Sequence, residues 1–180
     1  MAFEYDTFVC VDLPSPAADR VLEIRRRHRD DFRAALPAEI TVAGSNGVGP
    51  LEPAEDSTVV FAALDQIARE TVPIEVTFGP VVRFPNTEIF VLTVADAAPF
   101  DALHERVAAC GIRFKPIQFT FLPHCTLRSR SPVSDEDAAA LLRERIEGTH
   151  RLDTLSVYML DQLPVTLLHR TELRGDARSA

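Results

Sequence analysis

Hydrophobic positions along this chain alternate between two periodicities, and the same order of changes occurs twice. In the first half, apolar residues run almost continuously over 7–13 and recur at helical spacing from Pro14 to about Leu36. They return in the short stretch 39–43. Continuous or alternating runs predict strands, whereas apolar residues three or four positions apart predict helices. A helix over 57–70 and an alternating strand over 73–82 complete a strand-helix-strand-helix-strand order.

The second half repeats this order. The apolar run 88–94 predicts a strand, and the segment 99–111 predicts a helix that ends at a glycine. A short strand over 124–128 follows, and then a helix that extends to about Glu147. Ser134 followed by three acidic residues is a typical start for that helix. The strand-helix-strand-helix part of the first half therefore occurs again at matching spacing.

The chain closes with two further predicted strands over 152–160 and 165–173, which we expect to form a hairpin. Its 180 residues fit one domain. The doubled order predicts an α+β fold of two pseudo-symmetric lobes around a central cleft, each a small antiparallel sheet with outer helices. We place lobe one at about 1–85 and lobe two at about 86–180 of a single domain, 1–180, and leave open an exchange of terminal strands.

Two of the short strands carry the candidate chemistry. One contains His124 and Thr126 within Pro-His-Cys-Thr-Leu, and the other contains Glu39 and Thr41 within Glu-Ile-Thr-Val. Side chains two residues apart on a strand point to the same face. A threonine hydroxyl donates to phosphate oxygens, and imidazole moves a proton near neutral pH. A pseudo-twofold axis between the lobes would bring the two pairs to opposite sides of one cleft.

These two stretches resemble the paired His-x-Thr-x motifs of the 2H phosphoesterases. That family includes bacterial 2′-5′ RNA ligase-like proteins and RNA 2′,3′-cyclic phosphodiesterases. The second stretch fits its motif in full, including Pro123 before it and an arginine shortly after. The first stretch has Glu39 in place of the histidine, and Gly44 follows where a glycine is common. The resemblance covers nearly the whole chain.

The resemblance implies phosphodiester chemistry without a metal or cofactor, on a 2′,3′-cyclic phosphate or a 2′-5′-linked RNA or nucleotide. One group takes a proton from the attacking water, the other donates to the leaving ribose oxygen, and two threonines hold phosphate oxygens. This assigns His124 as general acid, Glu39 as the replacement base, and Thr41 and Thr126 as phosphate ligands. A carboxylate also repels a phosphodiester, while it stabilises protonated His124.

Two alternatives to an enzyme stay open. One is a catalytically degraded protein that kept the cleft and binds a nucleotide or RNA end. The other is a structural or interaction domain whose cleft is filled by side chains. Whether Glu39 acts as a base separates the first alternative from an enzyme, since only a working base would make up for the missing histidine.

Basic residues near the second motif are candidates for substrate binding. Arg128 shares the face of His124 on a strand, and Arg130 continues it, so we expect Arg128, and after it Arg130, to contact phosphate. Both could equally be surface charges. Just before the motif, basic residues alternate with phenylalanines, a mixture that can stack on a nucleobase. The alternative there, a core strand with solvated charges, is favoured. This segment holds Arg113, Phe114, Lys115, Phe119 and Phe121.

Charge and composition limit the partners. The net charge is −8, and Lys115 is the only lysine, so we expect no binding to a DNA duplex, which needs a basic face. A nucleotide or RNA end with a cyclic phosphate fits better. No apolar run reaches eighteen residues, which argues against a membrane-spanning helix. Three scattered cysteines favour reduced thiols in the cytoplasm, and we expect a monomer.

Overall fold

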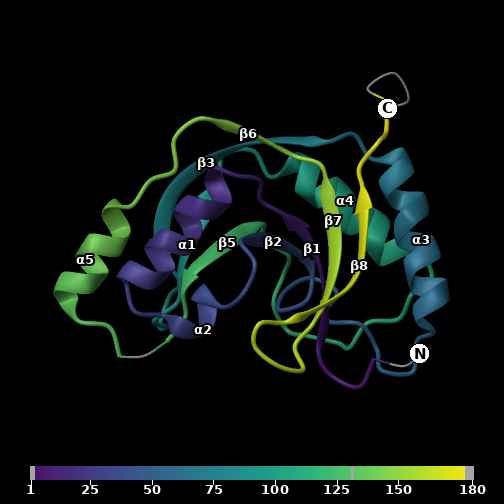
Figure 1. Ribbon diagram of the computed structural model, residues 1–180, viewed down its shortest axis with the longest axis horizontal. Coiled ribbons are helices and arrows are strands. Elements are labelled where there is room, and N and C mark those ends of the chain that lie inside the picture. Colours follow the sequence, from purple (N-terminus) through teal and green to yellow (C-terminus); the bar gives the residue numbers. More distant parts are fainter. Residues whose placement is uncertain (1–2, 131, 177–180) are drawn as a thin grey trace.

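A computed structural model describes residues 3–130 and 132–176. In this part of the chain, eight strands form two four-stranded antiparallel sheets with helices around them, which confirms the predicted α+β class and two-lobed arrangement (Figure 1). The first sheet has the order β2-β1-β7-β8, with bounds Glu39–Ala43, Thr7–Asp12, Thr154–Met159 and Thr166–Glu172. The second has the order β5-β4-β3-β6, with bounds His124–Arg128, Phe90–Val94, Ile74–Arg83 and Thr149–Leu152.

The two motif strands lie at adjoining edges of the two sheets. β2 is the first strand of one sheet and β5 the first strand of the other, and the two strands contact each other. They run together at the centre of the molecule (Figure 1). This is the side-by-side placement that a pseudo-twofold relation between the halves predicts.

Sheet membership does not follow chain order. β3 comes from the first half of the chain, yet it pairs with β4 and β6 of the second sheet. In exchange, β7 and β8 from the end of the chain complete the sheet of β1 and β2. Each sheet therefore contains strands from both halves, and buried apolar residues of both sheets form one continuous cluster. The two lobes share a single core.

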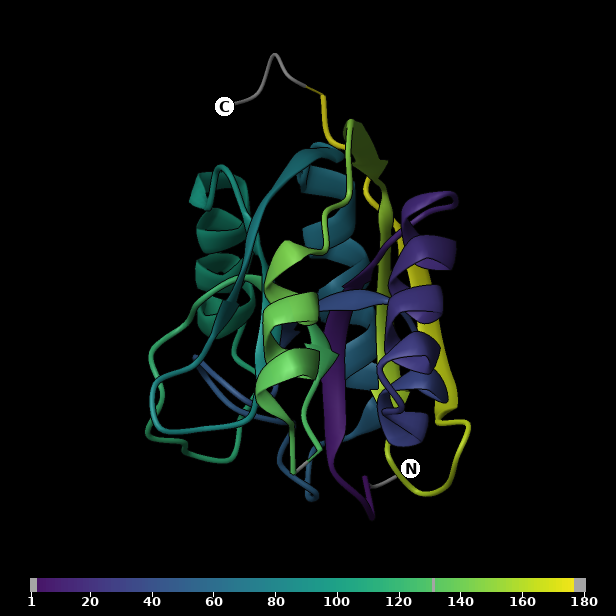
Figure 2. The ribbon, with the colours of Figure 1, turned by 90° about the vertical axis from the view of Figure 1, so that its left-hand side faces the viewer.

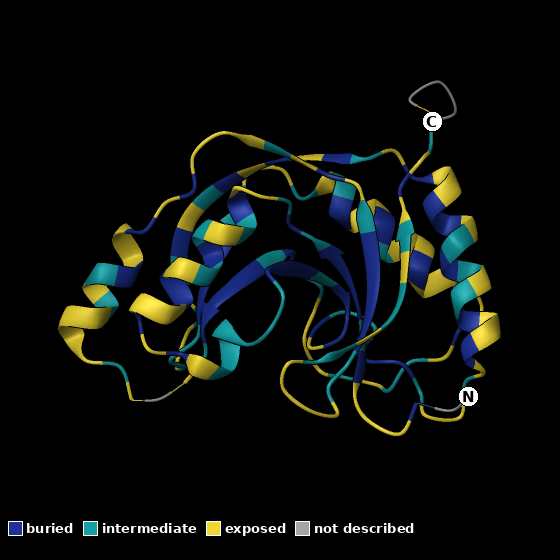
Figure 3. Ribbon diagram, viewed as in Figure 1, coloured by how far each residue is buried: buried dark blue, intermediate teal, exposed yellow. Residues whose placement is uncertain are grey.

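Burial along the strands explains the patterns in the sequence. β1 is the inner strand beside β2 and β7, and Val9, Cys10 and Val11 are all buried, so its apolar run is continuous. β3 instead alternates, with Ile74 and Val76 buried and the residues between them exposed. Figure 3 shows the buried inner strands and helices that expose their outer faces.

Five helices surround the sheets in the described segments. They are α1 Ala17–Arg27, α2 Asp31–Ala34, α3 Ser57–Glu70, α4 Ala98–Ala109 and α5 Asp135–Arg143. Contacts cross between the halves, because α1 and α2 pack against β5 while α4 packs against β2. In the view of Figure 2, α5 lies in front of the strands, and α1 and α4 lie to either side. None of the described helices has the length and apolar character needed to cross a membrane.

The single helix predicted from Pro14 to Leu36 is wrong, because the chain breaks between α1 and α2. Arg29 has a φ of 57°, a left-handed conformation that ends a helix. The Asp30 carboxylate then accepts a hydrogen bond from the Arg33 backbone N–H and caps α2. α2 contacts β5, and β2 begins five residues after α2 ends.

The last part of the chain also differs from the prediction. The strand predicted over 152–160 is β7, Thr154–Met159, but the predicted range also includes Leu152, the last residue of β6 in the other sheet. β6, Thr149–Leu152, was not predicted from the sequence. The preceding helix was expected to reach Glu147 but ends at Arg143. Glu144 is buried, extended, and paired with Arg20 and Arg27 of α1, which holds the chain out of a helical path.

Candidate functional site

Two adjoining cavities open over the motif strands. The first is lined by Glu39 and Thr41 of β2, and the second by His124 and Thr126 of β5. Arg33 and Ser45 line both cavities, so the two adjoin, and the pair is called the cleft below. The tertiary structure therefore brings all four motif residues predicted from the sequence to a shared cleft.

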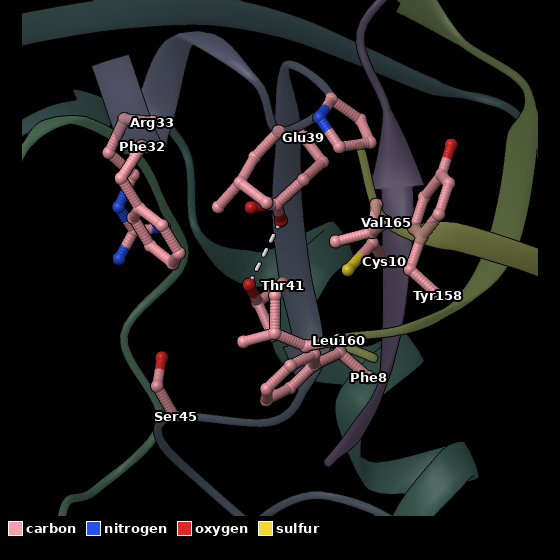
Figure 4. Close-up of a pocket in the computed structure, with 12 residues that line it drawn as sticks. Phe8, Cys10, Phe32, Arg33, Glu39, Thr41, Ser45, Tyr158, Leu160 and Val165 are labelled. Atoms are coloured by element: carbon pink, nitrogen blue, oxygen red, sulfur yellow. Dashed lines mark hydrogen bonds between the residues drawn. The ribbon is translucent and has the colours of Figure 1, made fainter. Parts of the chain in front are cut away.

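On the β2 side, Glu39 and Thr41 point into the first cavity (Figure 4). The Thr41 hydroxyl donates a hydrogen bond to Oε2 of Glu39 at 2.9 Å. Glu39 retains only 9% of its accessible surface, whereas Thr41 is half-buried. The carboxylate is thus held on a rigid strand at the cavity wall, where it can accept a proton from a bound water or hydroxyl.

On the β5 side, the imidazole of His124 has a defined orientation. Its Nδ1 lies 2.7 Å from the Leu122 carbonyl oxygen, which only accepts hydrogen bonds, so Nδ1 carries a proton and donates it. Nε2 is left as the atom for proton transfer. The ring packs edge-on against Phe84, with 5.2 Å between the ring centroids.

Burial lowers the pKa of His124 below its ordinary value, and the nearby positive charge of Arg33 acts in the same direction. The hydrogen bond to Leu122 and the negative charge of Glu39 oppose this shift. Without a ligand, His124 therefore holds its second proton less tightly than a free histidine does. A bound phosphate would add another negative charge, and so would favour the protonated ring.

The second cavity is large and has aromatic walls. Its volume is about 620 Å³, within the usual range for small-molecule sites. Phe84, Phe119 and Phe121 line it, and Phe121 stacks on His104 with ring centroids 4.0 Å apart. Such walls suit a flat apolar group such as a nucleobase.

Of the five residues named before the second motif, only Phe119 and Phe121 reach the cleft, because Phe114 packs against the core. Phe119 and Phe121 line the second cavity, as described above. The two basic residues are engaged elsewhere, since Arg113 pairs with Glu55 and Lys115 with Asp6. Their charges lie on exposed or half-buried side chains outside both cavities.

The structure corrects the expected role of Arg128. Its guanidinium donates to the carbonyl oxygens of His28 and Pro132, and it lines neither cavity. The register between β4 and β5 shifts between Thr126 and Arg128, so strict alternation from His124 does not hold at this end of β5, where the C-terminal cap of α1 binds the side chain. Arg128 therefore joins α1 to the end of β5 and does not face the cleft.

Arg130 also lines neither cavity, contrary to expectation, although it lies over Phe32, which lines the first cavity. It is exposed, and its guanidinium carbon lies 4.3 Å from the centroid of the Phe32 ring. β5 ends at Arg128, and the buried carboxylate of Asp30 accepts hydrogen bonds from the backbone N–H groups of Ser129 and Arg130. The chain turns at this anchor, so the face of the strand does not continue to Arg130.

Arg33 lines both cavities, although no pattern in the sequence singled it out. Its Nε donates to Oγ of Ser129 at 2.9 Å, and burial lowers the pKa of its guanidinium. Nothing in the sequence separates Arg33 from the other basic residues of the helix predicted there. The one usable signal was Asp30, because aspartate is a typical N-cap residue and α2 begins directly after it. On this new helix, Arg33 faces a different neighbour from the one it would face on a single long helix.

The three cysteines are free, and the two beside the motifs are buried. Burial raises the pKa of Cys10, with the negative charges of Glu39 and Asp12 adding to the effect. Burial likewise raises the pKa of Cys125. Thiols held protonated in this way are poor nucleophiles, and Cys125 lines neither cavity.

Comparison with known proteins gives a family and a set of similar folds. The family profile described as the 2′-5′ RNA ligase superfamily matches residues 13–162. No curated protein sequence matches this chain. Among solved structures, TT0787 of Thermus thermophilus is 20% identical with a TM-score of 0.68, covering 95% of this chain and 99% of that chain.

LigT of E. coli in its apo form is 16% identical with a TM-score of 0.63, covering 94% of this chain and 97% of LigT. LigT complexed with 3′-AMP is also similar, with 16% identity, a TM-score of 0.57 and the same coverage. At these identities the likeness to solved structures concerns the fold. The family profile, however, spans most of the sequence and both motif strands. This chain belongs to the 2′-5′ RNA ligase superfamily, the 2H phosphoesterases.

Proposed function

We propose that this protein is a metal-independent phosphodiesterase that acts on a 2′,3′-cyclic phosphate or on 2′-5′-linked RNA or nucleotides. The observation that carries the proposal is the shared cleft, which is bordered by Glu39 and Thr41 on one side and by His124 and Thr126 on the other. Family membership supports phosphoesterase chemistry in general. Structures of LigT with 3′-AMP and with phosphate support a nucleotide as the ligand.

In the proposed reaction, Glu39 accepts a proton from water while the water oxygen forms a bond to phosphorus. The bond from phosphorus to a ribose oxygen breaks, and that oxygen takes a proton from Nε2 of His124. The hydroxyls of Thr41 and Thr126 donate to the non-bridging oxygens. Thr41 must release Glu39 to do this, and that release frees the carboxylate to act as the base.

An acid and a base of this kind each contribute about 10²–10⁴ in rate when they are well positioned. Both carrier atoms here belong to side chains on strands, and the hydrogen bond of His124 to Leu122 leaves Nε2 as the donor. Rigid placement of the carriers is what such rates require. Glu39, in place of the histidine, keeps a proton acceptor in the cleft. The site therefore retains both a proton acceptor and a proton donor.

The second candidate is a protein that binds a nucleotide or an RNA end without turnover. The hydrogen bond between Thr41 and Glu39 favours it, because in the ligand-free cleft this hydroxyl is committed to a carboxylate instead of being free for phosphate. The negative charge of Glu39 also opposes the charge of a phosphodiester. Turnover separates the two candidates.

The test is hydrolysis of a nucleoside 2′,3′-cyclic phosphate and of a 2′-5′-linked dinucleotide with EDTA present. We expect turnover by the native protein, and a loss of about 10²-fold or more in His124→Ala. His150→Ala is the matched control, since that histidine lies on β6 and lines neither cavity. A folded native protein that binds either compound without hydrolysing it would instead establish the binding role.

A further inference from the structure

We infer that Arg33 binds the anionic phosphate of the substrate at the junction of the two cavities. This inference rests on the proposed function in one respect, namely that the ligand of the cleft carries a phosphate. No motif of the sequence assigns such a role to this part of the chain, and the two arginines expected to fill it, Arg128 and Arg130, line neither cavity.

The position of Arg33 is the first argument. Glu39 and Thr41 line only the first cavity, and His124 and Thr126 line only the second, whereas Arg33 lines both. A group bound to its guanidinium therefore lies between the two motif pairs. The reacting phosphate must occupy that same place, because both proton carriers have to reach it.

The free donors of Arg33 are the second argument. Its Nε is used by Ser129, as described above, but Nη1 and Nη2 have no hydrogen-bond partner within the described segments. No carboxylate in those segments lies within ion-pair distance of them either, although Glu39 lines the same cavity. A guanidinium needs both its charge and its donors satisfied, and a phosphate oxygen pair fits two parallel N–H groups.

The local fold holds this guanidinium in place. Asp30 caps α2 through the Arg33 backbone N–H, and buried Arg25 donates to the Arg33 carbonyl oxygen. Oγ of Ser129, which directly follows β5, accepts a hydrogen bond from Nε of Arg33. Arg33 is therefore held by the segment that leads to β2 and by the residue that follows β5 before a ligand arrives. This lowers the entropy lost when a ligand binds. In Figure 4, Arg33 and Glu39 lie on different sides of the first cavity.

Charge balance is the third argument. Where the 2H phosphoesterase motif has a histidine, this chain has the carboxylate of Glu39. A carboxylate repels the phosphate that it must help to attack. A fixed cation facing the same cavity offsets that repulsion. Glu39 and Arg33 line the same cavity without a direct ion pair, so an anion bound in that cavity lies near both charges.

The experiment measures binding, not turnover. Isothermal titration calorimetry with inorganic phosphate and with a nucleoside 3′-monophosphate compares native protein with Arg33→Gln, which removes the charge and keeps a polar side chain. We expect binding to weaken about 10- to 100-fold, the usual range for losing hydrogen bonds to a charged group. Arg26→Gln, an exposed residue of α1, should bind as the native protein does.

Arg33→Lys guards against a misfolded variant, because it keeps the charge and loses the paired donors. We expect it to bind more tightly than Arg33→Gln and more weakly than the native protein, with all variants unfolding at similar urea concentrations. Native-like affinity in a folded Arg33→Gln protein would overturn the inference, and so would a native protein that binds neither probe.

The outcome is separable from that of the proposed function. Binding that depends on Arg33 in a protein without turnover would support the inference and refute the phosphodiesterase. Turnover by a protein whose affinity for the two probes does not change when Arg33 is replaced would support the phosphodiesterase and refute the inference.

Discussion

Glu39 stands where the resembling family has a histidine, and the two side chains differ in charge as well as in basicity. A carboxylate is negative until it accepts a proton and neutral afterwards, whereas imidazole is neutral until it accepts a proton and positive afterwards. The negative charge also favours protonated His124, so the substitution affects both proton carriers. Its consequences are therefore measurable at single residues.

Replacing Glu39 separates its two effects. We expect Glu39→Gln to lower kcat by about 10²-fold or more, because the base is lost. Binding of a nucleoside monophosphate should be unchanged or tighter, because a repulsive charge is gone. Steady-state kinetics and calorimetry on the same preparations provide both numbers.

Glu39→His restores the family pattern and should preserve or raise activity. It is the matched counterpart of the amide variant, since it keeps a proton acceptor at the position. If this variant gained activity that the native protein lacked altogether, the native cleft would be a degraded site, and Glu39 would not be a base.

The pH dependence tests the role of His124. As general acid, His124 is active in its protonated form, and burial lowers its pKa below the ordinary 6.5. We therefore expect kcat/KM, which reports the free enzyme, to fall as pH rises through a value below 6.5. Rates measured from pH 4.5 to 8 check this. A rate that instead rises through that pKa would assign His124 as the base.

At the scale of elements, one buried arginine joins the segment before β2 to β5. Arg25 of α1 is fully buried and donates to the carbonyl oxygens of Arg33, Leu36 and Pro37. It also donates to the Thr126 carbonyl oxygen. All these acceptors are backbone groups beside the cleft, so Arg25 connects the segment that carries Arg33 and leads to Glu39 with the strand of the second motif.

Removing these bonds should be costly. Arg25→Met leaves several buried carbonyl groups without donors, each costing about 1–3 kcal/mol, so we expect a loss of roughly 3 kcal/mol or more in unfolding free energy. Urea denaturation measures it. Arg26→Met, one residue further along α1 and exposed, should change stability by less than about 0.5 kcal/mol. A loss below about 1 kcal/mol in Arg25→Met would show that water replaces the missing donors.

Over the whole molecule, the exchange of strands makes the two halves depend on each other. β1 has β7 as a neighbour on one side, and β3 pairs with β4 and β6, all of which follow residue 85. A chain cut there loses both the centre of the first sheet and every partner of β3. The pseudo-symmetric halves are thus repeats in chain order but not separate folding units.

Expression of residues 1–85 alone tests this. We expect the fragment to lack a cooperative unfolding transition, because β3 has no partner and the β1–β2 pair is too small to be stable. Circular dichroism with urea titration is the measurement, with the full chain as the control. A fragment that unfolds cooperatively would show that lobe one of the sequence-based division is an independent unit.

Local patterns in the sequence predicted most elements and both motif pairs, since alternation alone sets which side chains share a face of β2 and β5. The same rule failed for Arg128, because the register of β5 shifts after Thr126 and the end of α1 binds the side chain. The sequence showed phenylalanines alternating with basic residues before the second motif. Of these residues, only Phe119 and Phe121 reach the cleft.

The sequence by itself determined the periodicity of each strand and helix, the two motif pairs, and the substitution at Glu39, because these depend on residues close together in the chain. Only the tertiary structure decided that β3 and β7 change sheets, that the chain turns at Asp30, and that Arg33 faces both cavities. Those outcomes depend on contacts such as Asp30 with Ser129 and Arg33 with Ser129, between residues 99 and 96 positions apart. Local spacing carries no information about pairs that only folding brings together.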